Sequence, residues 1–275
     1  MLKFSIVISV YKKDRAEFVS RALDSVTKYQ TRKPDEVVLI VDGPVPDELK
    51  AIITAREREE AELYNVIWLP QNKGLGNALK IGVNEAKYGI IARMDSDDVS
   101  ASDRFEKQIT YMEEHPECDL LGGQITEFVD SESNIVGSRI VPCSQEDILM
   151  WLKGRCPFNH MSVTMLRSRV IAVGNYMDWH FNEDYYLWIR MALAGYKFAN
   201  LPDTLVNVRV GKEMYRRRGG WKYFKSEERL QRYMLKHDLI DILRYLYNTL
   251  GRFVIQVAMP NRLRGFIFKK LFRKH

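Results

Sequence analysis

Four short apolar runs open the chain at fairly regular spacing, over residues 4–10, 36–41, 65–69 and 89–94. They are rich in β-branched residues and show no polar alternation, which is typical of strands buried on both faces of a parallel sheet. The stretches between them have helical character. This βαβ repetition predicts an α/β fold with an open, doubly wound, mostly parallel sheet and right-handed crossovers.

The helices of this first half follow from their boundary signals. Asp14 and Glu17 have the spacing of a capping box, so a helix is expected to begin near Asp14. A second helix is expected over residues 46–61 and a third after the glycine-containing segment 73–76. Beyond residue 98 the pattern predicts helices over 104–114 and 184–193, strands over 120–129, 162–166 and 205–210, and an irregular polar stretch over 130–144.

The C-terminal part has a different pattern. Apolar residues recur there at alternating steps of four and three, which predicts an amphipathic helix: Leu239, Leu243, Leu246, Leu250, Phe253 and Val257. Pro260 ends this helix, and the final residues mix Phe, Leu and Ile with Lys and Arg. We therefore expect two units, a catalytic domain over residues 1–220 and an amphipathic, basic helical extension over 221–275.

Composition places the chain among ordinary globular proteins. It has 275 residues, of which 46% are hydrophobic and 28% charged, and no run of 18 uninterrupted apolar residues. The net charge of +6 is the balance of −7 over residues 1–208 and +13 over residues 209–275. Lys12 and Lys13 cut the first apolar run short, so we interpret it as a strand and not as a signal peptide.

The three cysteines form no CxxC pair. They argue against a disulfide framework or a thiolate metal site and fit a reducing compartment.

The sharpest chemical signal is the sequence Asp95-Ser96-Asp97-Asp98, directly after the fourth apolar run. Three carboxylates so close together repel one another, and a divalent cation is the usual partner that offsets this cost. Oxygen ligands favour Mg²⁺ or Mn²⁺, and no His or Cys nearby suggests zinc. The alternative is a polar turn. The position at the carboxyl end of a parallel strand, where ligands bind in such sheets, favours the metal.

Other polar residues at these strand ends leave two interpretations open. Asp42 either binds a base or ribose or stands in a turn before Gly-Pro. The loop around Lys73 leads into a helix and offers backbone N–H groups to a phosphate, although it matches neither the P-loop nor GxGxxG.

Three features of the second half are equally open. The adjacent acids Glu183 and Asp184 either complement a helix dipole or supply a general base. His160 is a core residue or a contact to phosphate or acceptor. The cluster Arg216, Arg217 and Arg218 is a solvated charge run or a clamp on a diphosphate.

Considered together, these segments resemble the family 2 glycosyltransferases, inverting enzymes of the GT-A fold that include bacterial enzymes of surface-polysaccharide synthesis. The matching segments run from residue 4 to residue 218: IVISVYKKD, VDG, QNKGLGNALKIGV, ARMDSDD and NEDYYLWIRMALAGYKFANLP.

The resemblance implies a role for each matching residue. Asp184 is the expected catalytic base, with Glu183 beside it. Asp97 is the expected metal ligand, with Asp98 as the alternative. The nucleotide-sugar site is expected to comprise Ser9, Tyr11, Asp42, Lys73, Asp95, Ser96, Asp97, His160, Arg216, Arg217 and Arg218.

These roles imply a metal-dependent enzyme, using Mn²⁺ or Mg²⁺, that moves a sugar from a nucleotide-sugar to a hydroxyl of a saccharide or lipid-linked saccharide acceptor. UDP is the expected nucleotide, and donor specificity is expected to involve residues 130–157. A sugar-phosphate nucleotidyltransferase, which would release pyrophosphate, is the alternative within the enzymes.

The basic tail raises the question of a partner surface. A nucleic-acid-binding module is a further alternative, but the body is acidic and carries no nucleic-acid motif, so we expect no nucleic-acid partner. Aromatic and apolar residues among the cations favour an anionic membrane surface instead. A helix packed on the catalytic domain, with a solvated basic face, is the other interpretation of residues 239–257. We expect a cytoplasmic protein that is peripheral on the inner membrane.

Overall fold

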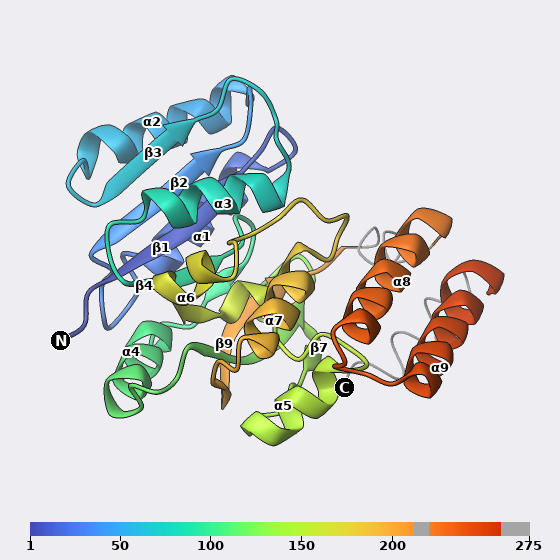
Figure 1. Ribbon diagram of the computed structural model, residues 1–275. Coiled ribbons are helices and arrows are strands. Elements are labelled where there is room, and N and C mark those ends of the chain that lie inside the picture. The colour runs from blue at the N-terminus through green and yellow to red at the C-terminus, as the bar shows by residue number, and fades with distance from the viewer. Residues whose placement is uncertain (212–219, 260–275) are drawn as a thin grey trace.

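The computed structural model describes residues 1–211 and 220–259. Its centre is one nine-stranded sheet of order β3-β2-β1-β4-β8-β6-β9-β5 (Figure 1). The remaining strand, β7, pairs with the second half of β6, on the same side as β8. The strands β1 to β4, β6 and β9 run parallel to one another, whereas β5, β7 and β8 are antiparallel to their neighbours. The predicted fold, an α/β architecture with a mostly parallel, doubly wound sheet, is confirmed.

The strands and helices have the following bounds. The strands are β1 Phe4–Val10, β2 Glu36–Val41, β3 Tyr64–Trp68, β4 Ile90–Met94, β5 Val99–Ser100, β6 Leu120–Phe128, β7 Ile135–Arg139, β8 Thr164–Leu166 and β9 Phe198–Arg209. The helices are α1 Ala16–Val26, α2 Asp47–Glu59, α3 Leu75–Glu85, α4 Arg104–Glu114, α5 Gln145–Leu152, α6 Arg167–Ala172, α7 Glu183–Leu193, α8 Trp221–Lys236 and α9 Ile242–Phe253.

Helices cover both faces of the sheet, and each face has its own hydrophobic core. On one face, alternate residues of β1 such as Ile6 and Ile8 pack with residues of α1, α2 and α4. On the other, Val7 and Ile40 pack with α3, α6 and α7, which lie in front of the sheet in Figure 1. Burial on both faces explains why the first strands are uniformly apolar in sequence.

Two local expectations were wrong. Residues 130–144 are not wholly irregular, because Asp130 takes a positive φ of 61° and reverses the chain, so that β7 pairs with β6. The Asp14–Glu17 capping box does not form either. Arg15 is the N-cap residue of α1 and makes no side-chain cap. The Asp14 carboxyl instead accepts hydrogen bonds from the Tyr11 N–H at 3.0 Å and the Ser96 hydroxyl at 2.9 Å.

The C-terminal helices α8 and α9 lie side by side at the edge of the molecule (Figure 1). Leu230 and Met234 of α8 join the same core as Trp188 of α7. After α9 the chain continues as a π-helical segment, Val254–Ala258. Among residues 1–211 and 220–259, no helix has the length and apolar character needed to cross a membrane. A division of the chain at residue 220 stays a prediction about its folding units.

The packing of α3 on the sheet gives a stability prediction. A Cβ atom on Gly82 would lie 2.5 Å from Val7 Cγ1 and 2.7 Å from Ile40 Cδ1, both buried on neighbouring strands. Gly82→Ala should therefore lower the free energy of unfolding by about 1–3 kcal/mol, despite the better helix propensity of Ala. The measurement is urea unfolding followed by circular dichroism.

Gly251 provides the matched control, because it lies in α9 and a Cβ there would meet no atom within 4 Å. Gly251→Ala should raise the free energy of unfolding by up to about 1 kcal/mol. Equal effects of the two substitutions would contradict this account of α3 packing.

Candidate active site

The predicted site residues gather at one edge of the sheet because the carboxyl ends of parallel strands meet there. Ser9 is the last but one residue of β1 and Tyr11 follows the strand, Asp42 follows β2, and residues 95–98 follow β4. Since β1 lies between β2 and β4, these three segments are neighbours. Ser9 and Tyr11 are both partly exposed at this edge.

The four residues after β4 differ in what they face. Asp97 is exposed. Asp98 is 2% exposed, and its Oδ1 atom accepts the backbone N–H of Arg209 in β9 at 2.8 Å. Ser96 is buried and donates to Asp14. Of the two predicted metal ligands, therefore, Asp97 presents its carboxylate to solvent, whereas Asp98 ties this turn to β9.

Crowding of carboxyl groups changes their acidity. Desolvation, followed by the negative charges of Asp95 and Asp14, raises the pKa of Asp97 to about 6. Burial, followed by the charges of Asp95 and Asp97, raises the pKa of Asp98 well above its usual range. The pKa of Asp14 is also raised, chiefly by burial. Burial is the largest cause of all three shifts and neighbouring negative charges add to it, and a bound cation would lower the pKa values again.

Arg93 lies beneath this cluster as a charged residue inside β4. It is 2% exposed, and its Nη2 atom lies 2.5 Å from Oδ1 of Asp95. Its Nε and Nη1 atoms are buried and have no hydrogen-bond partner among the residues that the structure describes. A buried guanidinium needs a neighbouring negative charge. Arg93 therefore pairs with Asp95 and offsets part of the negative charge of the turn.

The Asp42 carboxylate organises the glycine-containing loop. Its Oδ1 accepts the Lys73 N–H at 2.6 Å, and its Oδ2 accepts the Gly74 N–H at 3.0 Å and the Asn72 side-chain amide at 2.9 Å. Gly74 has a positive φ of 83° at this turn. Asp42 therefore stabilises the conformation of the loop before α3. The Lys73 side chain is exposed. Contact of either residue with a nucleotide stays a prediction.

The Glu183–Asp184 pair begins α7 and lies close to this loop. A Cβ on Gly76 of α3 would come within 3.3 Å of Glu183 Cβ, so the small residue permits the approach of the two helices. Burial, followed by the charge of Asp184 and with a smaller effect of Asp95, raises the pKa of Glu183 to about 7. The two acidic motifs, far apart in sequence, are therefore close enough to interact electrostatically.

Asp184 contacts a cysteine and His160 contacts a tyrosine. The Cys156 thiol donates to Asp184 Oδ2 at 3.8 Å, and burial raises the pKa of this thiol to about 12, so it keeps its proton. Nε2 of His160 lies 2.9 Å from the Tyr176 hydroxyl. Burial, helped by the charge of Arg93, lowers the pKa of His160 well below its usual range. His160 is therefore a neutral hydrogen-bonding group.

Several members of this site escaped the sequence analysis. Arg93 had a usable signal, since it is the one charged residue in the buried strand β4. Asp14 was misinterpreted as a helix cap. Tyr176 and Cys156 stand in segments without periodicity, and only tertiary packing brings them to the site.

Other expectations about the site are not tested by the structure. Arg216, Arg217 and Arg218 lie outside the described residues. In the part of the chain that is described, no group of three or more His, Cys, Asp or Glu side chains is arranged to hold a metal ion. All three cysteines are free.

Comparison with known proteins identifies the family. The model of "Glycosyl transferase family 2" matches residues 5–174, and that of "Glycosyl transferase family group 2" matches residues 90–269. The chain therefore belongs to glycosyltransferase family 2. Of the functions that the sequence left open, membership of this family supports glycosyl transfer.

Two relatives align over almost their whole length. The amylovoran biosynthesis glycosyltransferase AmsE of Erwinia amylovora is 38% identical, with 97% of this chain and 98% of the relative covered. The UDP-Gal:alpha-D-GlcNAc-diphosphoundecaprenol beta-1,3-galactosyltransferase of Escherichia coli is 34% identical, with 99% and 97% covered.

Solved structures support the GT-A fold. S. aureus TarS 1–349 in complex with UDP-GlcNAc gives a TM-score of 0.68 at 18% identity, with 98% of this chain and 76% of that chain covered. GalNAc-T7 with UDP, GalNAc and Mn²⁺ also gives a TM-score of 0.68 at 18% identity, with 97% and 54% covered.

The raised pKa of Glu183 gives a prediction for stability against pH. A carboxyl whose pKa rises from 4.5 to about 7 on folding binds more protons in the folded state between these values. Its contribution to stability is therefore greatest below pH 4.5 and falls as pH rises to about 7. Glu183→Gln removes this loss, so the variant should gain roughly 3 kcal/mol on wild type between pH 4.5 and pH 8.

The measurement is urea unfolding of both proteins across this range, with Glu114→Gln, at an exposed position, as the control. A constant difference between Glu183→Gln and wild type would show that Glu183 is not perturbed by folding.

Proposed function

We propose that this protein is an inverting, metal-dependent transferase that moves a sugar from a UDP-sugar to a hydroxyl of a lipid-linked saccharide during cell-surface polysaccharide synthesis. The observation that carries the proposal is the acidic turn Asp95–Asp98 at the carboxyl end of the parallel strand β4, next to the ends of β1 and β2, in a chain of glycosyltransferase family 2. The relatives named for amylovoran synthesis and for a diphosphoundecaprenol acceptor support the acceptor class.

The metal belongs at the turn after β4. Asp97 offers an exposed carboxylate, and the hard oxygen donors of this turn suit Mn²⁺ or Mg²⁺ completed by diphosphate oxygens. The bound ion would neutralise charge on the leaving diphosphate. Asp95, braced by Arg93, is proposed to contact the ribose, and Ser9 and Tyr11 to line the nucleotide pocket.

The reaction then needs a base on the opposite side of the anomeric carbon from the leaving group. The acceptor oxygen forms a bond to that carbon while the bond to the diphosphate oxygen breaks, and the electron pair leaves with the nucleoside diphosphate. The acceptor's proton passes to the carboxylate of Asp184. Because attack and departure are on opposite faces, the anomeric configuration inverts. The Cys156 thiol donates to Asp184 Oδ2 and so helps to orient the base.

The proposed reaction takes place at a membrane surface. A lipid-linked acceptor is confined to a bilayer, so we propose that the protein works peripherally on the cytoplasmic face of the inner membrane, with its basic C-terminal region against anionic lipid. Three free cysteines fit the reducing side of that membrane.

Exchange of the proposed base should separate binding from catalysis. Asp184→Asn is expected to keep UDP affinity within about twofold but to lower the transfer rate by roughly 10²–10⁴-fold, because the general base is lost. Glu183→Gln serves as the matched variant and should lose less. The measurement is the release of UDP in the presence of acceptor. Near-normal transfer by Asp184→Asn would exclude it as the base.

Removal of the proposed metal ligand should act on donor binding. Calorimetric titration of UDP into wild type is expected to show binding with Mn²⁺ that EDTA abolishes. Asp97→Ala should weaken the Mn²⁺-dependent binding by about tenfold or more, since a carboxylate ligand is lost. Asp103→Ala, a change at a partly exposed acidic position outside the turn, is the control. Unchanged affinity in Asp97→Ala would remove Asp97 from the metal site.

A further inference from the structure

The helix α9 differs from an ordinary surface helix because its apolar side is exposed and its polar side is buried. Its large apolar side chains face solvent, and two of them, Leu243 and Leu250, are 74% and 66% exposed. We call the exposed apolar residues of this helix the α9 outer face: Ile242, Leu243, Leu246, Tyr247, Leu250 and Phe253. The face contains no charged residue. A surface helix would normally bury such a stripe against the core.

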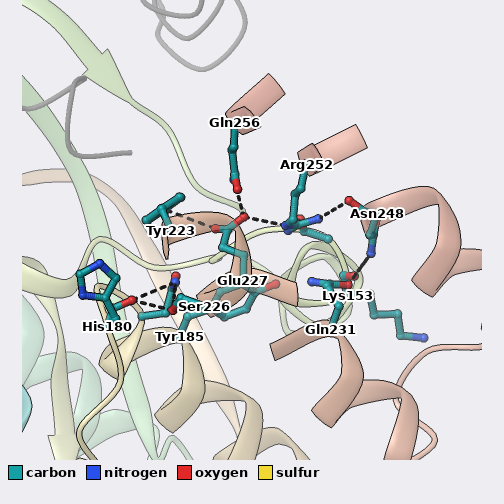
Figure 2. Close-up of polar contacts among 12 residues, drawn as sticks. Lys153, His180, Tyr185, Tyr223, Ser226, Glu227, Gln231, Asn248, Arg252 and Gln256 are labelled. Atoms are coloured by element: carbon teal, nitrogen blue, oxygen red, sulfur yellow. Dashed lines mark hydrogen bonds and ion pairs between the residues drawn. The ribbon is translucent and has the colours of Figure 1, made fainter. Parts of the chain in front are cut away.

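The inner face of α9 is polar and is held by specific contacts (Figure 2). The Arg252 Nε donates to Glu227 of α8 at 2.6 Å, and Gln256 donates to the same carboxylate at 2.8 Å. Asn248, which is 6% exposed, donates to the side chain of Gln231 and to the backbone carbonyl of Lys153, each at 2.8 Å. Buried polar groups held in this way fix one orientation of the helix, so the outward position of the apolar face is built into the fold.

Exposed cations lie on the adjoining helix α8. Five exposed Lys and Arg residues recur along α8 at steps of three and four, and we call them the α8 stripe: Lys222, Lys225, Arg229, Arg232 and Lys236. The two acids of this helix are already paired, since Glu227 binds Arg252 of α9 at 2.6 Å and Glu228 binds Arg232 of the stripe at 2.7 Å. Beyond Asp241 the sequence contains no acidic residue. An exposed apolar helix face together with exposed cations on the adjoining helix is the chemistry of a segment that lies in the interface of an anionic bilayer.

The alternative occupant, a second copy of this chain, fits less well. A symmetric dimer would place the same patch of both copies together and so bring two cationic stripes near each other. Anionic lipid instead supplies the complementary charge. We therefore propose that the α9 outer face enters the interfacial region of an anionic bilayer, with the α8 stripe against headgroup phosphates.

Polar residues of α9 also bond to the loop next to the proposed base. Besides Asn248 on Lys153, the Arg252 Nη2 donates to the Gly154 carbonyl at 2.7 Å. Two residues further along, Cys156 contacts the proposed base Asp184. The helix α9 is therefore hydrogen-bonded to residues 153–154, in the loop that also contains Cys156, the contact of the proposed base Asp184. This part of the inference rests on the proposed function, because it assigns the lipid-bound acceptor a path along α9.

The test is co-sedimentation of the full chain with vesicles of phosphatidylglycerol and phosphatidylcholine in equal parts, and with vesicles of phosphatidylcholine alone. Wild type is expected to bind the anionic vesicles. Leu246→Glu/Leu250→Glu should lower that binding roughly tenfold or more. Ile135→Glu/Ile171→Glu, which introduces the same charges at exposed apolar positions of β7 and α6, should bind like wild type. Lys222→Glu/Lys225→Glu should lose the preference for anionic lipid.

Two results would overturn the inference. One is unchanged vesicle binding by Leu246→Glu/Leu250→Glu. The other is a wild-type dimer in sedimentation velocity that this variant converts to monomer, with no vesicle binding by either protein. Mn²⁺-dependent UDP binding should be the same in wild type and variant, which shows that the variant is folded. Vesicle binding through α9 by a protein that moves no sugar would uphold the inference and refute the proposed function.

Discussion

The repulsion among carboxyl groups at the end of β4 is the constraint on which this site depends. Asp95, Asp97 and Asp98 follow one another within four residues, and Asp14 reaches the same turn through Ser96. Arg93 offsets part of the charge from beneath, since its guanidinium pairs with Asp95. The pKa values of Asp14, Asp97 and Asp98 are nevertheless raised, chiefly by burial and then by neighbouring negative charges. The proposed divalent cation would offset the remaining repulsion.

The sheet makes this clustering possible and also connects it to the rest of the chemistry. Parallel strands bring the ends of β1, β2 and β4 to one edge, where Asp42 shapes the loop before α3. Gly76 then lets α3 approach the start of α7, which carries Glu183 and Asp184. The backbone thus brings the start of α7 close to the loop that Asp42 shapes, and the roles of the two acidic segments toward a diphosphate and an acceptor stay proposals. Family membership gives this arrangement its reaction, glycosyl transfer.

Much of the fold could be predicted from sequence because its signals are local. Uniform apolar runs marked β1 to β4 to within one residue at each end, and the strand-end rule directed attention to Asp42 and residues 95–98. What escaped prediction depends on distant partners. The spacing of Leu243, Leu246 and Leu250 predicted an amphipathic α9, but it did not indicate which side is buried. That depends on Glu227 and Gln231, which bond to the polar side from another helix. Arg93 likewise acquires a role only beside Asp95, His160 and Glu183.

The central claim is that a divalent cation completes the carboxylate cluster when a nucleotide binds. The most direct test is a crystal grown with UDP and Mn²⁺, in which anomalous scattering locates the metal. The account predicts an anomalous peak at the turn after β4, within about 2.0–2.6 Å of a carboxylate oxygen of Asp97 and in contact with diphosphate oxygens. UDP bound at this edge with no metal at the turn, or with the metal held elsewhere, would contradict it.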